Sequence, residues 1–131
     1  MDTTSSPIEL LFPDHDAEMA RSRKLLALVP DVRLEWQPTP KSMTLGRLAT
    51  HVAELPRFGT MICTTQELDF ASGGWASSVA ETTAARLALL DATGKGMKAA
   101  IAALDWPAML APWVLRVGDT ILMKEPRSSH L

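Results

Sequence analysis

The stretch KSMTLGRLATHVAELP, residues 41–56, decides how the rest of the chain is interpreted. Ser42 or Thr44 can begin a helix here, because a side-chain oxygen at the cap accepts a first-turn amide that has no other partner. The apolar residues that follow are at helical spacing, and they are Leu45, Leu48, Ala49, Val52 and Leu55. This spacing predicts an amphipathic helix, which Pro56 is expected to end or kink because proline lacks the amide that a helix interior needs.

His51 lies at the flank of the apolar face of this helix. Leu55, Phe58 and Ile62 follow it on the same side at i+4, i+7 and i+11, so we expect the imidazole to be partly enclosed. Glu54 lies farther from the apolar face, and we expect a solvated charge there. The alternative is that Glu54 accepts a hydrogen bond from His51 or acts as a general base. The sequence thus raises the question whether His51 is a metal ligand or a polar residue at the edge of a core.

Composition favours one helical domain that spans residues 1–131. The chain is 47% hydrophobic, and alanine and leucine outnumber the β-branched residues. Thirteen basic and fifteen acidic side chains give a net charge of −2, with no basic run that could follow a phosphate backbone, so we expect no nucleic-acid partner. Cys63 is the only cysteine, so no internal disulfide can form, and we expect a small buried hydrophobe there.

The chain gives no sign of a membrane partner. No segment approaches the ~20 apolar residues of a membrane span, and the first ten residues carry neither a basic leader nor an apolar export segment. We therefore expect a cytoplasmic protein.

We predict an all-α fold, an up-down bundle of three main helices with a short β-hairpin and the stub of a fourth helix. Gly118 and Asp119 suit the two-residue turn of the hairpin. The expected elements are a loosely ordered segment over 1–11, a helix over 14–29, a loop over 31–40 pinned by Trp36, the helix that begins at Ser42 or Thr44, a helix capped by Ser77 or Ser78, the hairpin over 112–125 and the helix stub over 126–131. The four tryptophans, Trp36, Trp75, Trp106 and Trp113, are expected to pack under loops and hairpin rather than to stack on a ligand.

Two segments carry a resemblance to a known family. Residues 17–56, AEMARSRKLLALVPDVRLEWQPTPKSMTLGRLATHVAELP, resemble the N-terminal half of the DinB-like superfamily of metal-binding four-helix bundles. The shared features are an opening helix that ends in Val-Pro, the Trp-x-Pro-x-Pro loop and a helix that bears Leu-Ala-x-His-Val-Ala-Glu-Leu-Pro. The hairpin segment PWVLRVGDTILMKEPR, residues 112–127, is similar to the segment that leads such proteins into their last helix. The resemblance spans most of the chain from Phe12 to Arg127.

The resemblance implies a divalent metal, zinc or nickel among others, with an open coordination position. Three histidines typically hold it, one on the second helix and two from an H-x-x-x-H pair on the last helix. His51 matches the first, and the pair has no counterpart, because His130 comes too early to stand for either member. We therefore expect a family member that lacks its final helix. In some relatives the metal activates a low-molecular-weight thiol for S-transfer or isomerisation.

Two functions follow as hypotheses. The first is a metal-dependent transferase or hydrolase, with a small thiol as one candidate substrate and the missing ligands supplied by a second chain or by His15, Glu54 or His130. The second is a non-catalytic helical module that works as a homodimer or with another partner. Three amphipathic helices that would surround a fourth leave an apolar groove, and such surfaces rarely stay exposed.

Overall fold

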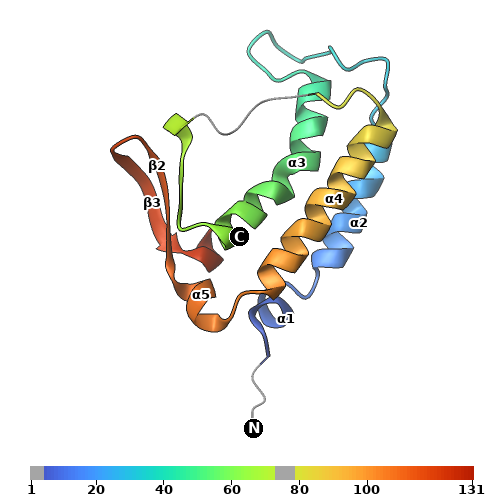
Figure 1. The fold of residues 1–131 in the computed structure, drawn as a ribbon. Coiled ribbons are helices and arrows are strands. Elements are labelled where there is room, and N and C mark those ends of the chain that lie inside the picture. Colours follow the sequence, from blue (N-terminus) through green and yellow to red (C-terminus); the bar gives the residue numbers. More distant parts are fainter. Residues whose placement is uncertain (1–4, 73–78) are drawn as a thin grey trace.

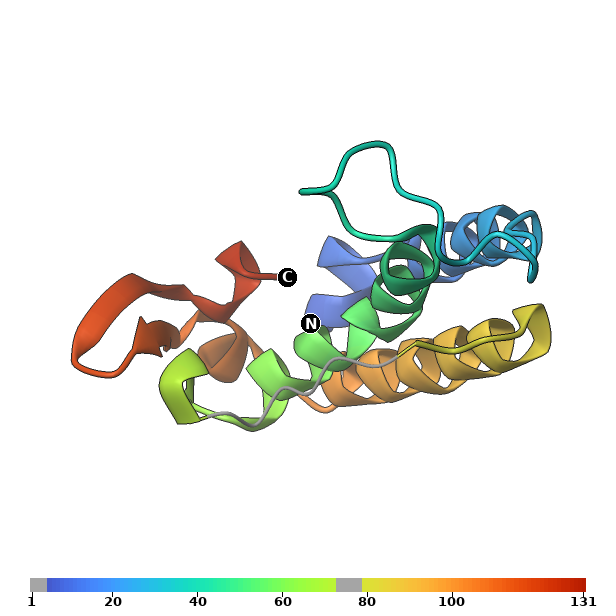
Figure 2. The ribbon, with the colours of Figure 1, turned by 90° about the horizontal axis from the view of Figure 1, so that it is seen from above.

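The computed structural model describes residues 5–72 and 79–131 (Figure 1). Its elements are, in chain order, α1 (Pro7–Leu11), α2 (His15–Ala27), α3 (Leu45–Thr64), β1 (Glu67–Asp69), a 3-10 turn (Phe70–Ser72), α4 (Thr83–Ala102), α5 (Trp106–Leu110), β2 (Pro112–Val117), β3 (Thr120–Pro126) and a second 3-10 turn (Arg127–Ser129). Figure 2 shows the β2–β3 hairpin at one end of the molecule. The end of α2 and the beginning of α4 lie at the opposite end.

The all-α prediction is wrong. The described chain is 57% helical and also contains a three-stranded mixed sheet in the order β1-β2-β3. β1 pairs in parallel with β2, where Glu67 is opposite Val114, and β2 pairs antiparallel with β3. β1 has three residues, too few to show the alternation that marks a strand in a sequence. Its pairing depends on a partner far along the chain, which local pattern does not reveal.

The start of the described chain is also more ordered than expected. Residues 7–11 form α1, so the prediction of a loosely held segment is wrong there. Pro7 is buried and stands in the first turn, where its missing amide costs nothing. Ile8 and Phe12 pack against a buried cluster formed by Cys63, Ile101 and Met109. Apolar contact with the core therefore orders this short helix.

A second buried cluster lies where the three long helices meet. It contains Leu26 from α2, Ala49 and Ala53 from α3 and Leu90 from α4, each at most 3% exposed. The two alanines of α3 let its backbone approach the neighbouring helices closely. This cluster fixes the face of α3 that points inward, and so it also fixes which residues of α3 point outward.

Threonine side chains cap α3 and α4. Thr44 accepts a hydrogen bond from the amide of Arg47 at 3.2 Å, as its cap position predicts. The helix continues through Pro56 to Thr64, and Figure 1 shows that it bends along its length.

The predicted cap of the following helix is wrong. α4 begins at Thr83, and the side chain of Thr82 accepts from the amide of Ala85 at 3.0 Å. Ser77 and Ser78, the expected caps, lie outside the described residues. Thr82 has the same capping chemistry, so the sequence offered several equivalent starts.

The C-terminal segment folds against α3 as a hairpin and a turn. Gly118 adopts φ +56° in the tight turn between β2 and β3, a conformation that glycine adopts without strain. Residues 126–131 do not form the predicted helix stub, because Arg127–Ser129 is a 3-10 turn. The guanidinium of Arg127 donates to the carbonyls of Ile62, Thr65 and Ala108 at 2.9–3.0 Å. Arg127 thereby ties the end of the chain to the last turn of α3.

The prediction that the tryptophans pack under loops and hairpin is correct for some of them and wrong for Trp36. Trp113 is 0% exposed, which confirms its place under the hairpin, and Trp106 donates its indole N–H to the carbonyl of Ser5 at 2.9 Å. Trp36 is 57% exposed, so its side chain does not pin the loop. Trp75 lies outside the described residues.

Candidate functional site

Glu54 is the unexpected residue of α3. Its predicted place on the solvated face is wrong, because it is 2% exposed. Arg47 Nη1 lies 3.1 Å from Glu54 Oε1, and Arg57 Nη2 lies 3.7 Å from Oε2. A buried carboxylate is tolerated when cations compensate its charge, and these two arginines supply that compensation. The spacing of Arg47, Glu54 and Arg57, at i, i+7 and i+10, was the signal in the sequence that would have predicted this cluster.

His51 borders the same carboxylate. Its Nδ1 lies 3.9 Å from Glu54 Oε1, an ion-pair distance that is too long for a hydrogen bond. The Nδ1 atom is buried without a hydrogen-bond partner, while the side chain as a whole is 32% exposed. The prediction of a partly enclosed imidazole is confirmed. Because Nδ1 is turned toward Glu54, Nε2 is the ring nitrogen available to a ligand.

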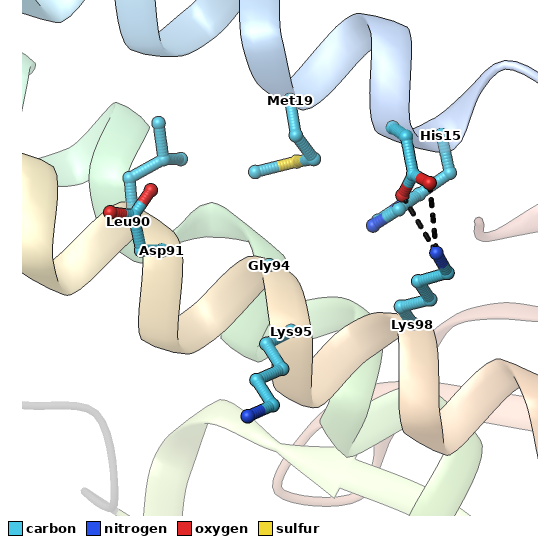
Figure 3. Close-up of a pocket in the computed structure, with 8 residues that line it drawn as sticks. His15, Met19, Leu90, Asp91, Gly94, Lys95 and Lys98 are labelled. Atoms are coloured by element: carbon cyan, nitrogen blue, oxygen red, sulfur yellow. Dashed lines mark hydrogen bonds and ion pairs between the residues drawn. The ribbon is translucent and has the colours of Figure 1, made fainter.

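The described structure does not bring the three histidines together. His15 stands at the start of α2, in a groove between α2 and α4 (Figure 3). His130 packs edge-on against the Trp113 ring, with 5.0 Å between ring centroids, and its Nε2 is buried without a hydrogen-bond partner. Among the described residues, neither His15 nor His130 joins His51 in a group that could hold a metal. Within one chain, therefore, neither histidine completes a metal site around His51.

The groove beside His15 is a packing feature of α2 and α4. Figure 3 shows Met19 reaching toward Gly94, and a Cβ at Gly94 would lie 2.6 Å from Met19 Cε. At the rim Lys98 Nζ lies 2.9 Å from both carboxylate oxygens of Asp16. The hydrogen bond and the charge of Lys98 hold the pKa of Asp16 below its ordinary value. With a volume of about 290 Å³, the groove is at the small limit of ligand sites.

Cys63 offers no nucleophile. It is 8% exposed, and burial raises the pKa of its thiol, although the charge of Arg127 acts in the opposite direction. A thiol kept protonated is a poor nucleophile and a poor metal ligand. The prediction of a small buried hydrophobe is confirmed.

The described residues do not form a complete metal site around His51. Within residues 5–72 and 79–131, no three His, Cys, Asp or Glu side chains are grouped so as to hold a metal. Catalytic zinc sites use three protein ligands and an open position, so His51 alone does not fit a complete site. Glu54 fits the role behind such a ligand, because metal-bound histidines commonly present their second nitrogen to a carboxylate.

The outer side of α3 is covered over only half its length. Near the bottom of the helix, Ile62 is 0% exposed and the Phe58 ring meets Trp113 edge-on at a centroid distance of 6.0 Å. In the first half of α3, Leu48 precedes His51 and is 48% exposed, and Leu55 follows it and is 46% exposed. We call Leu48, His51 and Leu55 the uncovered stripe. It sets the candidate ligand within an apolar surface.

Comparison of the chain with known protein families, with curated proteins and with solved structures finds no match. The DinB-like resemblance stays a prediction from the motifs. Among the described helices, none combines the length and apolar character needed to cross a membrane.

Proposed function

We propose that this chain is a DinB-like protein that binds a divalent metal ion, zinc or nickel, through His51 and completes the metal site with a second copy of itself. The arrangement of His51 beside the buried Glu54 supports this proposal, with 3.9 Å between Nδ1 and Oε1. A carboxylate that accepts a hydrogen bond from one imidazole nitrogen leaves the other nitrogen free for a metal, and Glu54 would take this role if the 3.9 Å separation shortened when the metal binds.

The uncovered stripe supports the choice of a second copy as partner. Leu48 and Leu55 stand at nearly equal distances before and after His51 on one face of α3. Met43 precedes the cap and is 49% exposed, at the position that usually packs on the residue equivalent to Leu48. Together these three half-exposed side chains form an apolar strip beside His51. A partner that covers this surface brings its own residues to His51.

The family resemblance favours a metal-dependent transferase or hydrolase, with a small thiol as candidate substrate. A bound divalent metal lowers the pKa of a thiol or water so that a nucleophile exists near neutral pH. In this chain His51 would hold the ion and Glu54 would orient His51. Arg47 and Arg57 pair with the carboxylate of Glu54 and hold it in place.

A second candidate function is a homodimeric helical module without metal. The same uncovered stripe supports it, because half-exposed leucines on one helix face are typical of an association surface.

Thermal unfolding with and without added zinc or nickel tests the proposal. We expect the metal to raise the melting temperature of the wild-type protein and not of His51→Ala, because only a folded site binds it. His15→Ala is the matched control and should respond like the wild type. No shift in any of the three proteins would refute metal binding. Sedimentation of the metal-free protein as a dimer would then favour the second candidate.

A further inference from the structure

A cleft of about 830 Å³ lies between the loop after α2 and the segment before α4. Its volume is within the range of small-molecule sites. Its lining residues come from three places: the loop over 31–36, the Thr44 cap of α3 and the segment that ends at Thr82. Neither of the candidate functions above uses this cleft.

Buried polar side chains hold both walls of the cleft. Arg86 is 0% exposed, and its guanidinium donates to the carbonyl of Ala80 at 3.0 Å, to the carbonyl of Val29 at 3.0 Å and to Asp31 Oδ1 at 2.9 Å. The hydroxyl of Thr50, also 0% exposed, accepts from the amide of Ala80 at 2.8 Å. The Nε atom of Arg86 is buried without a hydrogen-bond partner among the described residues, so the bonds from its two terminal nitrogens and from Thr50 hold the walls in place. The cleft is therefore preformed.

The loop wall is also seated on α3. The carbonyl of Trp36 accepts from the amide of Leu45 at 2.7 Å, and that of Leu34 accepts from Gly46 at 2.8 Å. A Cβ at Gly46 would lie only 2.9 Å from Leu34 Cβ, so glycine permits this close approach. The Trp36 side chain is consequently presented at the cleft by a fixed backbone.

The cleft combines an aromatic surface with negative charge. Trp36 lines it and is 57% exposed. Among the described residues, Glu35, Glu81 and Arg33 also line it, and no side-chain hydrogen bond or ion pair engages them there. The fourth charged lining residue, Asp31, is balanced by Arg86 at 2.9 Å. Two carboxylates against one guanidinium leave one uncompensated negative charge.

We propose that this cleft binds a small organic monocation, an amine with an aromatic or aliphatic body. Its body would pack on the Trp36 ring and its ammonium would face Glu35 and Glu81. Cations are attracted to the face of tryptophan more strongly than to other rings, and the nearby carboxylates add Coulomb attraction. An anion of the same shape is excluded by the same charges.

Titration of the metal-free full chain with phenethylammonium, followed by NMR of the tryptophan indole N–H signals, tests this proposal. Trp36→Phe identifies the Trp36 signal, and the indoles of Trp106 and Trp113 serve as internal references. We expect a saturable shift of the Trp36 signal and none of these two reference signals, and binding weakened roughly tenfold in the double variant Glu35→Gln, Glu81→Gln. The control Glu9→Gln, on α1, should bind like the wild type.

3-Phenylpropanoate, which carries a carboxylate in place of the ammonium, should give no saturable shift. Equal binding of the anion, unchanged affinity in the double variant, or no saturable shift with phenethylammonium would each overturn the proposal. Both titrations are carried out in the presence of EDTA, which removes divalent metal ions. Their outcome therefore does not depend on whether His51 binds a metal.

Discussion

Replacement of Glu54 by glutamine tests whether the buried carboxylate organises the His51 region. Glutamine keeps the volume of the side chain and removes its charge. Arg47, whose side chain is 19% exposed, would then lose its contact with the charge of Glu54. We therefore expect Glu54→Gln to destabilise the fold and to disturb His51.

The magnitude follows from the exposure of each partner. A hydrogen bond to a charged group contributes about 1.5–3 kcal/mol, and the Arg47–Glu54 contact at 3.1 Å is of this kind. Arg57 is 48% exposed at 3.7 Å, so its share is at most about 0.5 kcal/mol. Fully buried pairs lose about 3–5 kcal/mol when one partner is removed, but the partial exposure of Arg47 reduces this value. We expect a loss of about 2–3 kcal/mol.

Urea unfolding at pH 7, followed by circular dichroism, measures this loss. Glu18→Gln is the matched control, because Glu18 also pairs with an arginine three residues away on a helix but is exposed, as is Arg21. The control should lose no more than about 0.5 kcal/mol. If Glu54→Gln and Glu18→Gln lose equal amounts, Glu54 does not act as a buried, charge-compensated group.

Three further perturbations follow from the fold. The amide of Gly118 lowers the pKa of Asp69. This carboxylate therefore stabilises the fold above its unfolded pKa of 3.8, and the contribution is lost as the pH falls through its folded pKa. The difference in unfolding free energy between the wild type and Asp69→Asn should therefore narrow in acid-unfolding curves measured below pH 3.8. Arg86→Met should cost about 3–4 kcal/mol in urea unfolding, because it removes the hydrogen bonds from a fully buried guanidinium to the carbonyl of Ala80 and to Asp31. Gly46→Ala should destabilise by about 1–2 kcal/mol through the close approach to the loop. Gly96→Ala should stabilise α4 by up to about 1 kcal/mol, because its Cβ would meet only Thr60 Oγ1, at an ordinary contact distance of 3.7 Å. Equal melting temperatures for the two alanine variants would contradict this assignment.

Local chemistry in the sequence predicted several features correctly. The Thr44 cap, the helix after it and the Gly118 turn each depend on residues close together in the chain. The partial enclosure of His51 followed from the apolar residues in its column. Such features are set by periodicity and by turn preferences, which a single sequence carries.

Features that depend on distant partners were missed. β1 forms because β2 presents an edge, and α1 orders because Ile8 packs on residues far along the chain. Glu54 was assigned to the surface because a helical wheel records angle and not the reach of two arginines that neutralise a carboxylate. Tertiary contact therefore decided the fold class, whereas the surroundings of Glu54 come from two arginines of its own helix whose spacing the sequence already carried.

The most direct test of the central claim is the metal content per chain by plasma mass spectrometry, on protein purified without a histidine tag. The proposal that His51 holds a metal shared with a second copy predicts about one zinc or nickel ion per two chains, and no bound metal in His51→Ala. Absence of metal from the wild-type protein after exposure to both ions, or equal metal in the variant, would contradict it.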